Sequence, residues 1–397
     1  MRLLLIKESF FATLLLTAIV IMLGLIPLKI ELLGPIKKEI DDFDIYDLFF
    51  SGKERKGSKD PNIVLIQAAK TRSEILNQLK IINTGQPAVV GIDLSFSDKK
   101  DSIIDNKLIS LIVNNKNMVP GYTLDLDKKT PSLIIEKLIP EDYLLKQGGY
   151  MNFSHAHSTD VIRAFPPFYT ENKIKYPAFS SRIAEIFSPD KFKKISNRNR
   201  RKEFVNYSGN IDYYLNYSES QLKELDYKKE LSFLKGKIVL LGFFTQNDSV
   251  KVIDDIFYSP LNNVIAGRSF PDMYGVVIHA NILSMILNGK NYINAPSVWF
   301  SYFIGFFVSF FLVYYILLCY RKYKHPAHIR FLALLFLAIL LTALFFLKIF
   351  DLFAIKVNLF PILFTMAFCV ELFEIYKYMA AFLNRKVNYK TIFIDSN

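Results

Sequence analysis

The sequence has few of the residues that usually build chemical sites. Its 397 residues include two cysteines, one tryptophan and five histidines. Both cysteines, Cys319 and Cys369, fall in apolar runs, so residues 31–297 have neither a thiol nor a disulfide framework. The motifs G-x-S-x-G, H-E-x-x-H, G-x-x-x-x-G-K-[ST] and G-x-G-x-x-G are also missing. These absences exclude the common signatures of hydrolases, metalloproteases and nucleotide-binding proteins, and we expect neither catalysis nor a cofactor.

Charge is scarce in four long stretches of the chain. They begin near Ser9, Val298, Phe331 and Val357, and are rich in Leu, Phe, Ile and Ala. A helix that crosses a bilayer needs about 20 apolar residues, because the hydrocarbon is about 30 Å thick. The sequence therefore predicts four membrane-spanning helices. The first is longer than the core of a signal peptide and lacks a small-x-small cleavage site, so we expect it to be retained.

The flanking charges predict the orientation. The loop 321–329 with Arg330 has four cations and no acid, which indicates the cytoplasmic side. Both termini are then cytoplasmic and the large domain is extracytoplasmic, in the cytoplasmic membrane of a bacterium. The predicted segments are a cytoplasmic N-terminus 1–8, a transmembrane helix 9–30, an external domain 31–297, a transmembrane helix 298–320, a cytoplasmic loop 321–329, a transmembrane helix 330–350, an external loop 351–356, a transmembrane helix 357–380 and a cytoplasmic tail 381–397.

The net charge of +12 comes mostly from the membrane-flanking parts. Outside residues 31–297 there are 13 Lys and Arg against five Asp and Glu. The external domain shows no basic stripe of the kind that nucleic-acid binding requires, so we expect no nucleic-acid partner. Its densest cation run, residues 191–202, is interpreted as a solvated loop, with contact to an anionic partner as the alternative.

The external domain shows an α/β pattern. Its apolar runs are continuous rather than alternating, which is typical of strands covered by helices on both faces. The predicted strands are 62–67, 87–96, 117–122, 203–208 and 236–244. The predicted helices are 70–83, 107–115, 177–187 and 280–288.

These motifs, in their order, resemble a known family. "AVVGIDLSFSD", "GGYMNFSHAHSTDVIRAFPPFY", "FVNYSG", "LKGKIVLLGFFTQNDSVKVIDDIFYSP" and "GVVIHANILSMILNG" precede three spans, as in the second class of CHASE extracellular sensory domains. The resemblance covers nearly the whole chain and implies an α/β sensor of bacterial membrane receptors. Two features differ: Gln67 and Ala68 stand where the family's first strand usually ends in an acidic pair, and we expect no output domain after the last span.

Candidate binding residues lie at the predicted strand ends and in the loops. Asp93 follows a buried strand, at the edge where α/β sheets bind ligands, although its carboxylate could equally cap a turn. Asp160 and Arg163 either clamp a small polar ligand or pair with each other. For Asp255, next to Asp254, the choice between ligand binding and a structural role stays open in the same way.

Histidine offers two further candidates. His279 is predicted to end a strand and to open the helix 280–288, where it either fixes the turn or contributes to a ligand site. His155 and His157 have a metal-like spacing, but no third ligand is evident, and two polar loop histidines are the alternative.

The sequence therefore favours a non-enzymatic sensory subunit in the membrane. Its external domain would detect a small-molecule or protein ligand, and the spans would relay the signal to a separate cytoplasmic output protein. The alternative is an assembly subunit that docks through the external domain onto an envelope complex. The oligomeric state, a homo-oligomer included, stays open.

Overall fold

The computed structural model divides the chain into two compact units. Residues 39–293 form one, and residues 1–38 together with 294–397 form the other. We call them the α/β unit and the membrane unit. The structure describes residues 2–25, 44–51, 59–96, 99–125, 132–134, 138–153, 161–171, 174–245, 255–262, 270–290, 292–323 and 329–393.

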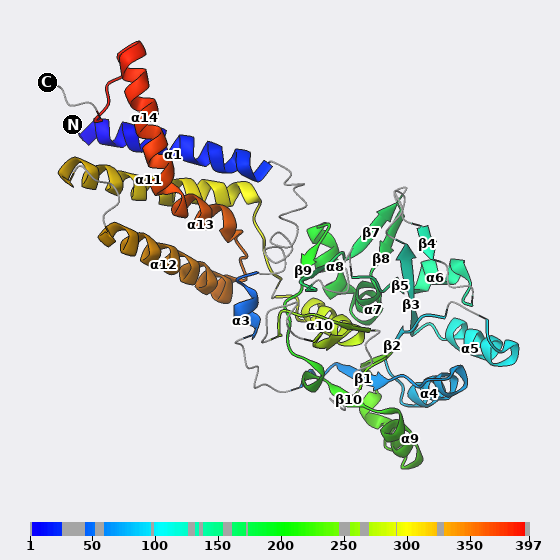
Figure 1. Cartoon of the computed structure of the whole chain (residues 1–397). Coiled ribbons are helices and arrows are strands. Elements are labelled where there is room, and N and C mark those ends of the chain that lie inside the picture. The colour runs from blue at the N-terminus through cyan, green and yellow to red at the C-terminus, as the bar shows by residue number, and fades with distance from the viewer. Residues whose placement is uncertain are drawn as a thin grey trace. The chain divides into compact units, whose positions relative to one another are not determined.

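The α/β unit is built on a seven-stranded sheet (Figure 1), with the strand order β10-β1-β11-β2-β3-β4 and with β5 added beside β3. All neighbours are parallel except β3 and β4. The strands of this sheet are β1 (Ile63–Gln67), β2 (Val89–Asp93), β3 (Met118–Asp125), β4 (Ser132–Ile134), β5 (Gly149–Tyr150), β10 (Leu215–Tyr217) and β11 (Ile238–Gly242).

The central strands are apolar along their length because helices cover both faces. Residues Ile63 to Ile66 of β1 are fully buried, and so are residues Ile238 to Leu241 of β11. On β2, Gly91 allows close packing, since a Cβ there would lie 2.5 Å from Cδ1 of Ile183. This confirms the predicted α/β sheet and the strands at 62–67, 87–96, 117–122 and 236–244 within a few residues.

Helices form a layer on each side of the sheet (Figure 1). On one side α4 packs against α5 and α9, and on the other α10 packs against α7 and α8. The helices of the unit are α3 (Asp47–Ser51), α4 (Arg72–Thr84), α5 (Ser102–Asn114), α6 (Glu141–Gln147), α7 (Phe179–Phe187), α8 (Pro189–Arg198), α9 (Glu219–Tyr227) and α10 (Gly275–Asn288), with short 3-10 turns at Ile211–Tyr213 and Leu231–Leu234.

Small two-stranded sheets lie outside the main one. β6 (Ala164–Phe165) pairs with β9 (Glu203–Phe204), β7 (Phe168–Glu171) with β8 (Ile174–Pro177), and β12 (Ile256–Phe257) with β13 (Met273–Tyr274). The predicted strand 203–208 is therefore only two residues of strand, paired outside the main sheet. Residues 191–198, predicted as part of a solvated loop, belong to α8, which Ile195 anchors in the core.

The membrane unit consists of long apolar helices. Among the described residues, three are long and apolar enough to cross a membrane, and a fourth span results if one bent pair is counted as a single span. They are α1 (Arg2–Leu25), α11 (Val298–Tyr323), α12 (Ile329–Phe353) and the pair α13 (Leu359–Ala367) with α14 (Cys369–Val387). The sequence indicates one continuous run over 357–380, whereas the structure bends by 58° between α13 and α14.

Buried polar groups lie within this unit as well. Glu8 on α1 is fully buried and accepts a hydrogen bond of 2.8 Å from the hydroxyl of Tyr376 on α14. The tail after α14 returns to the same place, since the Tyr389 hydroxyl lies 3.2 Å from that of Tyr376. Glu8 is thus part of a polar contact that joins the first and last helices.

Candidate functional site

The site begins at the carboxyl edge of the sheet. In the strand register Gln67 of β1 lies beside Gly242 of β11, and Gly242 lies beside Asp93 of β2. The last residues of three adjacent parallel strands are therefore level with one another. Ligands of open α/β sheets bind outside this edge.

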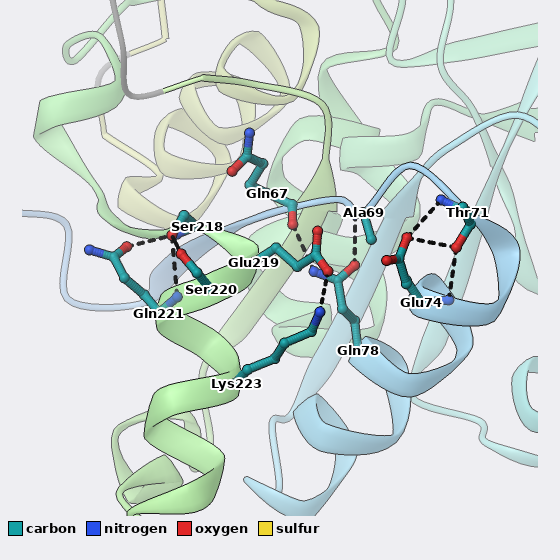
Figure 2. A network of polar contacts seen from close by, with 10 residues as sticks. All are labelled: Gln67, Ala69, Thr71, Glu74, Gln78, Ser218, Glu219, Ser220, Gln221 and Lys223. Atoms are coloured by element: carbon teal, nitrogen blue, oxygen red, sulfur yellow. Dashed lines mark hydrogen bonds and ion pairs between the residues drawn. The ribbon is translucent and has the colours of Figure 1, made fainter.

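The end of β1 is occupied by a structural contact. The side chain of Gln78, fully buried on α4, accepts a hydrogen bond of 2.8 Å from the Ala69 amide and donates one of 2.9 Å to the Gln67 carbonyl. Figure 2 shows this contact between the helix-capping residues Thr71 with Glu74 and Ser218 with Gln221. The Gln78 side chain thus binds the backbone on both sides of Ala68, at the end of β1, where the family that the sequence resembles usually has an acidic pair.

Asp93, at the end of β2, has a side chain that is only 8% exposed. One carboxylate oxygen, Oδ1, lies 4.0 Å from Nε2 of His279. The other, Oδ2, is buried without a hydrogen-bond partner among the described residues. A buried polar atom in this state is unfavourable, and it marks a place where a proton or a ligand would be bound.

Asp255 lies at the N-terminus of α10. A Cβ on Gly275, the first residue of that helix, would be 2.9 Å from Oδ1 of Asp255, so glycine allows the carboxylate to approach the first turn. Tyr274, at the N-cap, provides no side-chain hydrogen bond there. The amide end of a helix favours negative charge, but burial of the Asp255 carboxylate outweighs this and raises its pKa.

His279 lies within α10, and the prediction that it ends a strand and precedes the helix is wrong. Because α10 is buried on nearly all sides, its first residues are as apolar and β-branched as a strand. The imidazole lies between Phe153 and Phe179, with ring centroids at 4.6 Å and 5.0 Å. Its Nδ1 is 3.0 Å from the hydroxyl of Ser180 on α7.

Burial shifts the pKa values of all three ionisable side chains at this site. Burial, and next the charge of Asp255, raises the pKa of Asp93 well above its ordinary value. Burial also raises the pKa of Asp255 from 3.8 to about 7. It lowers the pKa of His279 from 6.5 to about 3, although a hydrogen bond with the Met151 backbone acts in the opposite direction. At neutral pH His279 is uncharged and Asp255 is close to its midpoint, while burial favours the protonated form of Asp93.

Ser180, His279 and Asp93 include the residue types of a catalytic triad, but their geometry is unsuited to one. In a triad the serine bonds Nε2 and the carboxylate accepts from Nδ1. Here the serine faces Nδ1, and the 4.0 Å from Nε2 to Asp93 exceeds a hydrogen bond. Ser180 is also fully buried and lies 3.3 Å from the His279 carbonyl. The arrangement suits proton or cation binding better than attack on a substrate.

Arg163 takes part in a different contact. Its guanidinium forms a forked ion pair with Asp47 on α3, at 3.0 Å from Nε to Oδ1 and 2.6 Å from Nη2 to Oδ2. Asp160, Asp254, His155 and His157 lie outside the described residues, so the structure neither pairs Asp160 with Arg163 nor assigns a metal to the two histidines. Among the residues that are described, no group of three His, Cys, Asp or Glu side chains could hold a metal ion.

Sequence reasoning missed several polar residues that position α10. The side-chain oxygen Oδ1 of Asn281 accepts hydrogen bonds from the backbone amides of Ser208, at 2.7 Å, and Gly209, at 3.2 Å. The Ser284 hydroxyl donates a hydrogen bond of 2.6 Å to Asp60. The available signal was the set of polar residues on a helix otherwise apolar all round, because such residues are buried and need partners.

Comparison with known proteins gives one family. The family model described as CHASE2 domain matches residues 14–315, most of the chain. No curated protein and no solved structure matches.

Proposed function

The chain belongs to the CHASE2 family, and from that premise we propose that it is a sensory subunit that relays a signal across the membrane to a separate cytoplasmic partner. CHASE2 domains are extracytoplasmic sensor domains, and this chain joins one to helices that can span a membrane. The α/β unit would detect an envelope or extracellular signal. Both termini would lie in the cytoplasm, where the partner would be contacted.

One observation supports a specific input site more than any other. Asp93 has a buried oxygen at the carboxyl edge of the sheet that finds no hydrogen-bond partner in the described part of the chain, while His279 lies next to this carboxyl and the charge of Asp255 acts on it. A proton or a cationic group of a ligand would satisfy that oxygen. The site would therefore take a ligand with a positively charged group, or respond to protonation.

The route from the site to the membrane unit is short. α10 contains His279, ends at the left-handed Gly289 and is followed by Tyr292 and Ile293, which are both buried. Ile293 is the last residue of the α/β unit, and its carbonyl accepts hydrogen bonds of 3.4 Å and 3.3 Å from Arg198 and Arg200.

The next residue is held just as firmly. Asn294, the first residue of this segment in the membrane unit, donates a hydrogen bond of 2.7 Å to the Ala354 carbonyl and accepts one of 2.8 Å from the Lys356 amide. Ile293 and Asn294 are adjacent in the chain, and each is held by hydrogen bonds within a different unit. A shift of α10 would therefore act directly on Asn294. A ligand would act by binding one arrangement of α10 more tightly than another.

A reporter of dimerisation fused after the tail tests this function. The wild type should respond when the external pH or a cationic solute changes. Asp93→Asn should lose the response to the cationic solute and show a smaller pH response, because an amide cannot change charge and Asp255 alone still titrates. Asp226→Asn, at an exposed position on α9, is the matched control and should respond as the wild type does. An unchanged response in Asp93→Asn would remove the site from the relay.

The assembly alternative predicts a different result. If the reporter stays constant in every variant, and cross-linking in mild detergent recovers the same external partner in fixed stoichiometry, the chain is a docking subunit rather than a sensor.

A further inference from the structure

The most basic segment of the α/β unit lies at the end from which the chain enters the membrane unit. Residues 191–202 contain no acidic residue and seven basic ones, Lys191, Lys193, Lys194, Arg198, Arg200, Arg201 and Lys202. The structure separates these seven into an inner and an outer group.

The inner group fixes the segment to the connector. The Arg198 guanidinium forms an ion pair of 2.6 Å with Glu203, whose side chain is 1% exposed, and its Cζ lies 4.9 Å from the ring centroid of Tyr292. Arg200 shares with Arg198 the carbonyl of Ile293. Lys191 lies against Gly289, with its Cδ 3.3 Å from the position of a Cβ there. The segment is therefore bound to residues 289–293 at several points.

The outer group points to solvent. Lys193, Lys194, Arg201 and Lys202 are exposed, and so is Lys290 on the connector itself. α8 packs inward through Ile195 and through Phe192, whose ring contacts that of Phe168 at 5.7 Å. Among the described residues, none of the four outer side chains has a carboxylate within ion-pair distance. They form a positively charged surface, which we call the basic face.

Chain length limits how far the basic face can be from a bilayer. Ile293 precedes the start of α11 at Val298 by five residues. Five extended residues reach about 18 Å at most, whatever arrangement the two units adopt. The Debye length is about 10 Å at 0.1 M salt, so attraction to the membrane surface is largely screened at full extension of the connector and becomes strong once the face comes within about one Debye length of the surface.

We propose that the basic face docks on the anionic phospholipid headgroups of the membrane into which the same chain inserts. The charge is complementary, acidic residues are absent from the segment, and the connector holds it near the surface. A basic residue close to an anionic surface contributes about fivefold in binding, the equivalent of about 1 kcal/mol. Since the face is attached to Ile293, docking would also restrain the residue through which α10 meets the membrane unit.

The test uses the full chain in lipid nanodiscs. Cys319 and Cys369 are replaced by alanine, Asn197 on the exposed side of α8 by cysteine, and the thiol is labelled with a bimane fluorophore. Lipids with a spin label on the headgroup then quench the fluorophore when the face lies on the bilayer. We expect strong quenching with phosphatidylglycerol, weak quenching with phosphatidylcholine alone, and loss of the difference in about 1 M NaCl, where the Debye length is about 3 Å.

A charge-reversed variant and a matched control make the test specific. Changing Lys193, Lys194, Arg201 and Lys202 to Glu should lower the docked-to-undocked ratio by at least roughly 600-fold, which is fivefold for the loss of each positive charge before the repulsion of the new carboxylates is added, and reduce quenching to the phosphatidylcholine level. The control changes four exposed lysines elsewhere, Lys80, Lys107, Lys229 and Lys235, to Glu, with the same change in net charge. It should leave quenching unchanged.

Two results would overturn the proposal. Equal quenching in both lipids, or in the reversed and control variants, would show that headgroup charge does not hold the face. Protection of the label in native membranes but not in pure-lipid nanodiscs would replace the lipid with a polyanionic envelope partner.

Discussion

Replacing Asp255 by Asn should stabilise the α/β unit at about pH 8 and have no effect at about pH 4. Burial raises the pKa of Asp255 from 3.8 to about 7. The folded chain therefore binds this proton more tightly than the unfolded chain, in which the pKa is about 3.9. The sign follows: the stability linked to Asp255 is fully present below about pH 3.8, and it is lost as pH rises through about 7.

The expected change in the free energy of unfolding follows from the same shift in the pKa of Asp255. The span from 3.8 to about 7 corresponds to about 4 kcal/mol, at about 1.4 kcal/mol for each pH unit. Because the residue is only half-buried, solvent screening reduces the expected effect to about 2–4 kcal/mol. Asparagine keeps the shape without the charge, so the variant should lose this part of the pH dependence.

Urea unfolding of the full chain in mild detergent, followed by near-ultraviolet circular dichroism, measures the difference between wild type and variant. His279 contributes in the opposite direction, since its pKa is lowered from 6.5 to about 3 and its stability is lost as pH falls through that window. That contribution largely cancels when the two proteins are compared at one pH. Asp226→Asn, at an exposed site, should show no such difference. A loss of stability in Asp255→Asn at about pH 8 would refute the reasoning, because it would mean that the charged carboxylate has a favourable partner.

Two further substitutions test contacts around the site. Arg163→Ala removes the forked ion pair with Asp47, and it should lower the free energy of unfolding by about 2 kcal/mol and speed hydrogen exchange in residues 44–51, with only partial recovery in Arg163→Lys because lysine cannot form the fork. Gln78→Met leaves the Ala69 amide and the Gln67 carbonyl without their partner, so urea unfolding should show a loss of about 2–3 kcal/mol. Asn77→Met, at the exposed neighbouring position on the same helix, is the control and should leave the free energy of unfolding unchanged.

The α/β sheet could be predicted because its physical cause is local. β1, β2 and β11 are short continuous apolar runs rich in β-branched residues and bounded by Gly, Pro, Asn or charge, which is typical of strands covered on both faces. The start of α10 could not be predicted in the same way. Val276, Val277 and Ile278 are typical of strands, and no capping side chain marks Gly275 as the first helical residue.

α8 illustrates a second limit. It packs through Phe192 and Ile195, which are three residues apart and give the helix one apolar side, but these two residues stand within a run of cations and the helix has only ten residues. From the sequence alone, the cations outweigh these two residues and favour a solvated loop.

The site itself was accessible only in part. Asp93, Asp255 and His279 were each a candidate, but their proximity depends on β2, the loop before β12 and α10, which are far apart in sequence. Ser180 gave no signal at all, because a serine within a helix has no distinguishing pattern around it. Arg163 had an oppositely charged residue nearby in the chain, whereas its actual partner Asp47 lies 116 residues away.

The energies at the site bear on whether ionisation alone could move α10. Reversing a two-state equilibrium from 1:99 to 99:1 takes about 5.5 kcal/mol. If the two arrangements differ in whether Asp255 is buried, about 4 kcal/mol is the upper limit for that carboxyl, enough to take the ratio from about 1:30 to about 30:1. The charge of Asp255 adds to burial in raising the pKa of Asp93. Asp93 would therefore contribute free energy in the same direction as Asp255, since both carboxyls favour the protonated state when buried. The hydrogen bonds of Asn281 and Ser284 oppose any shift of α10, so they reduce the response that either carboxyl could produce alone, and the two carboxyls together should move the helix further than Asp255 by itself.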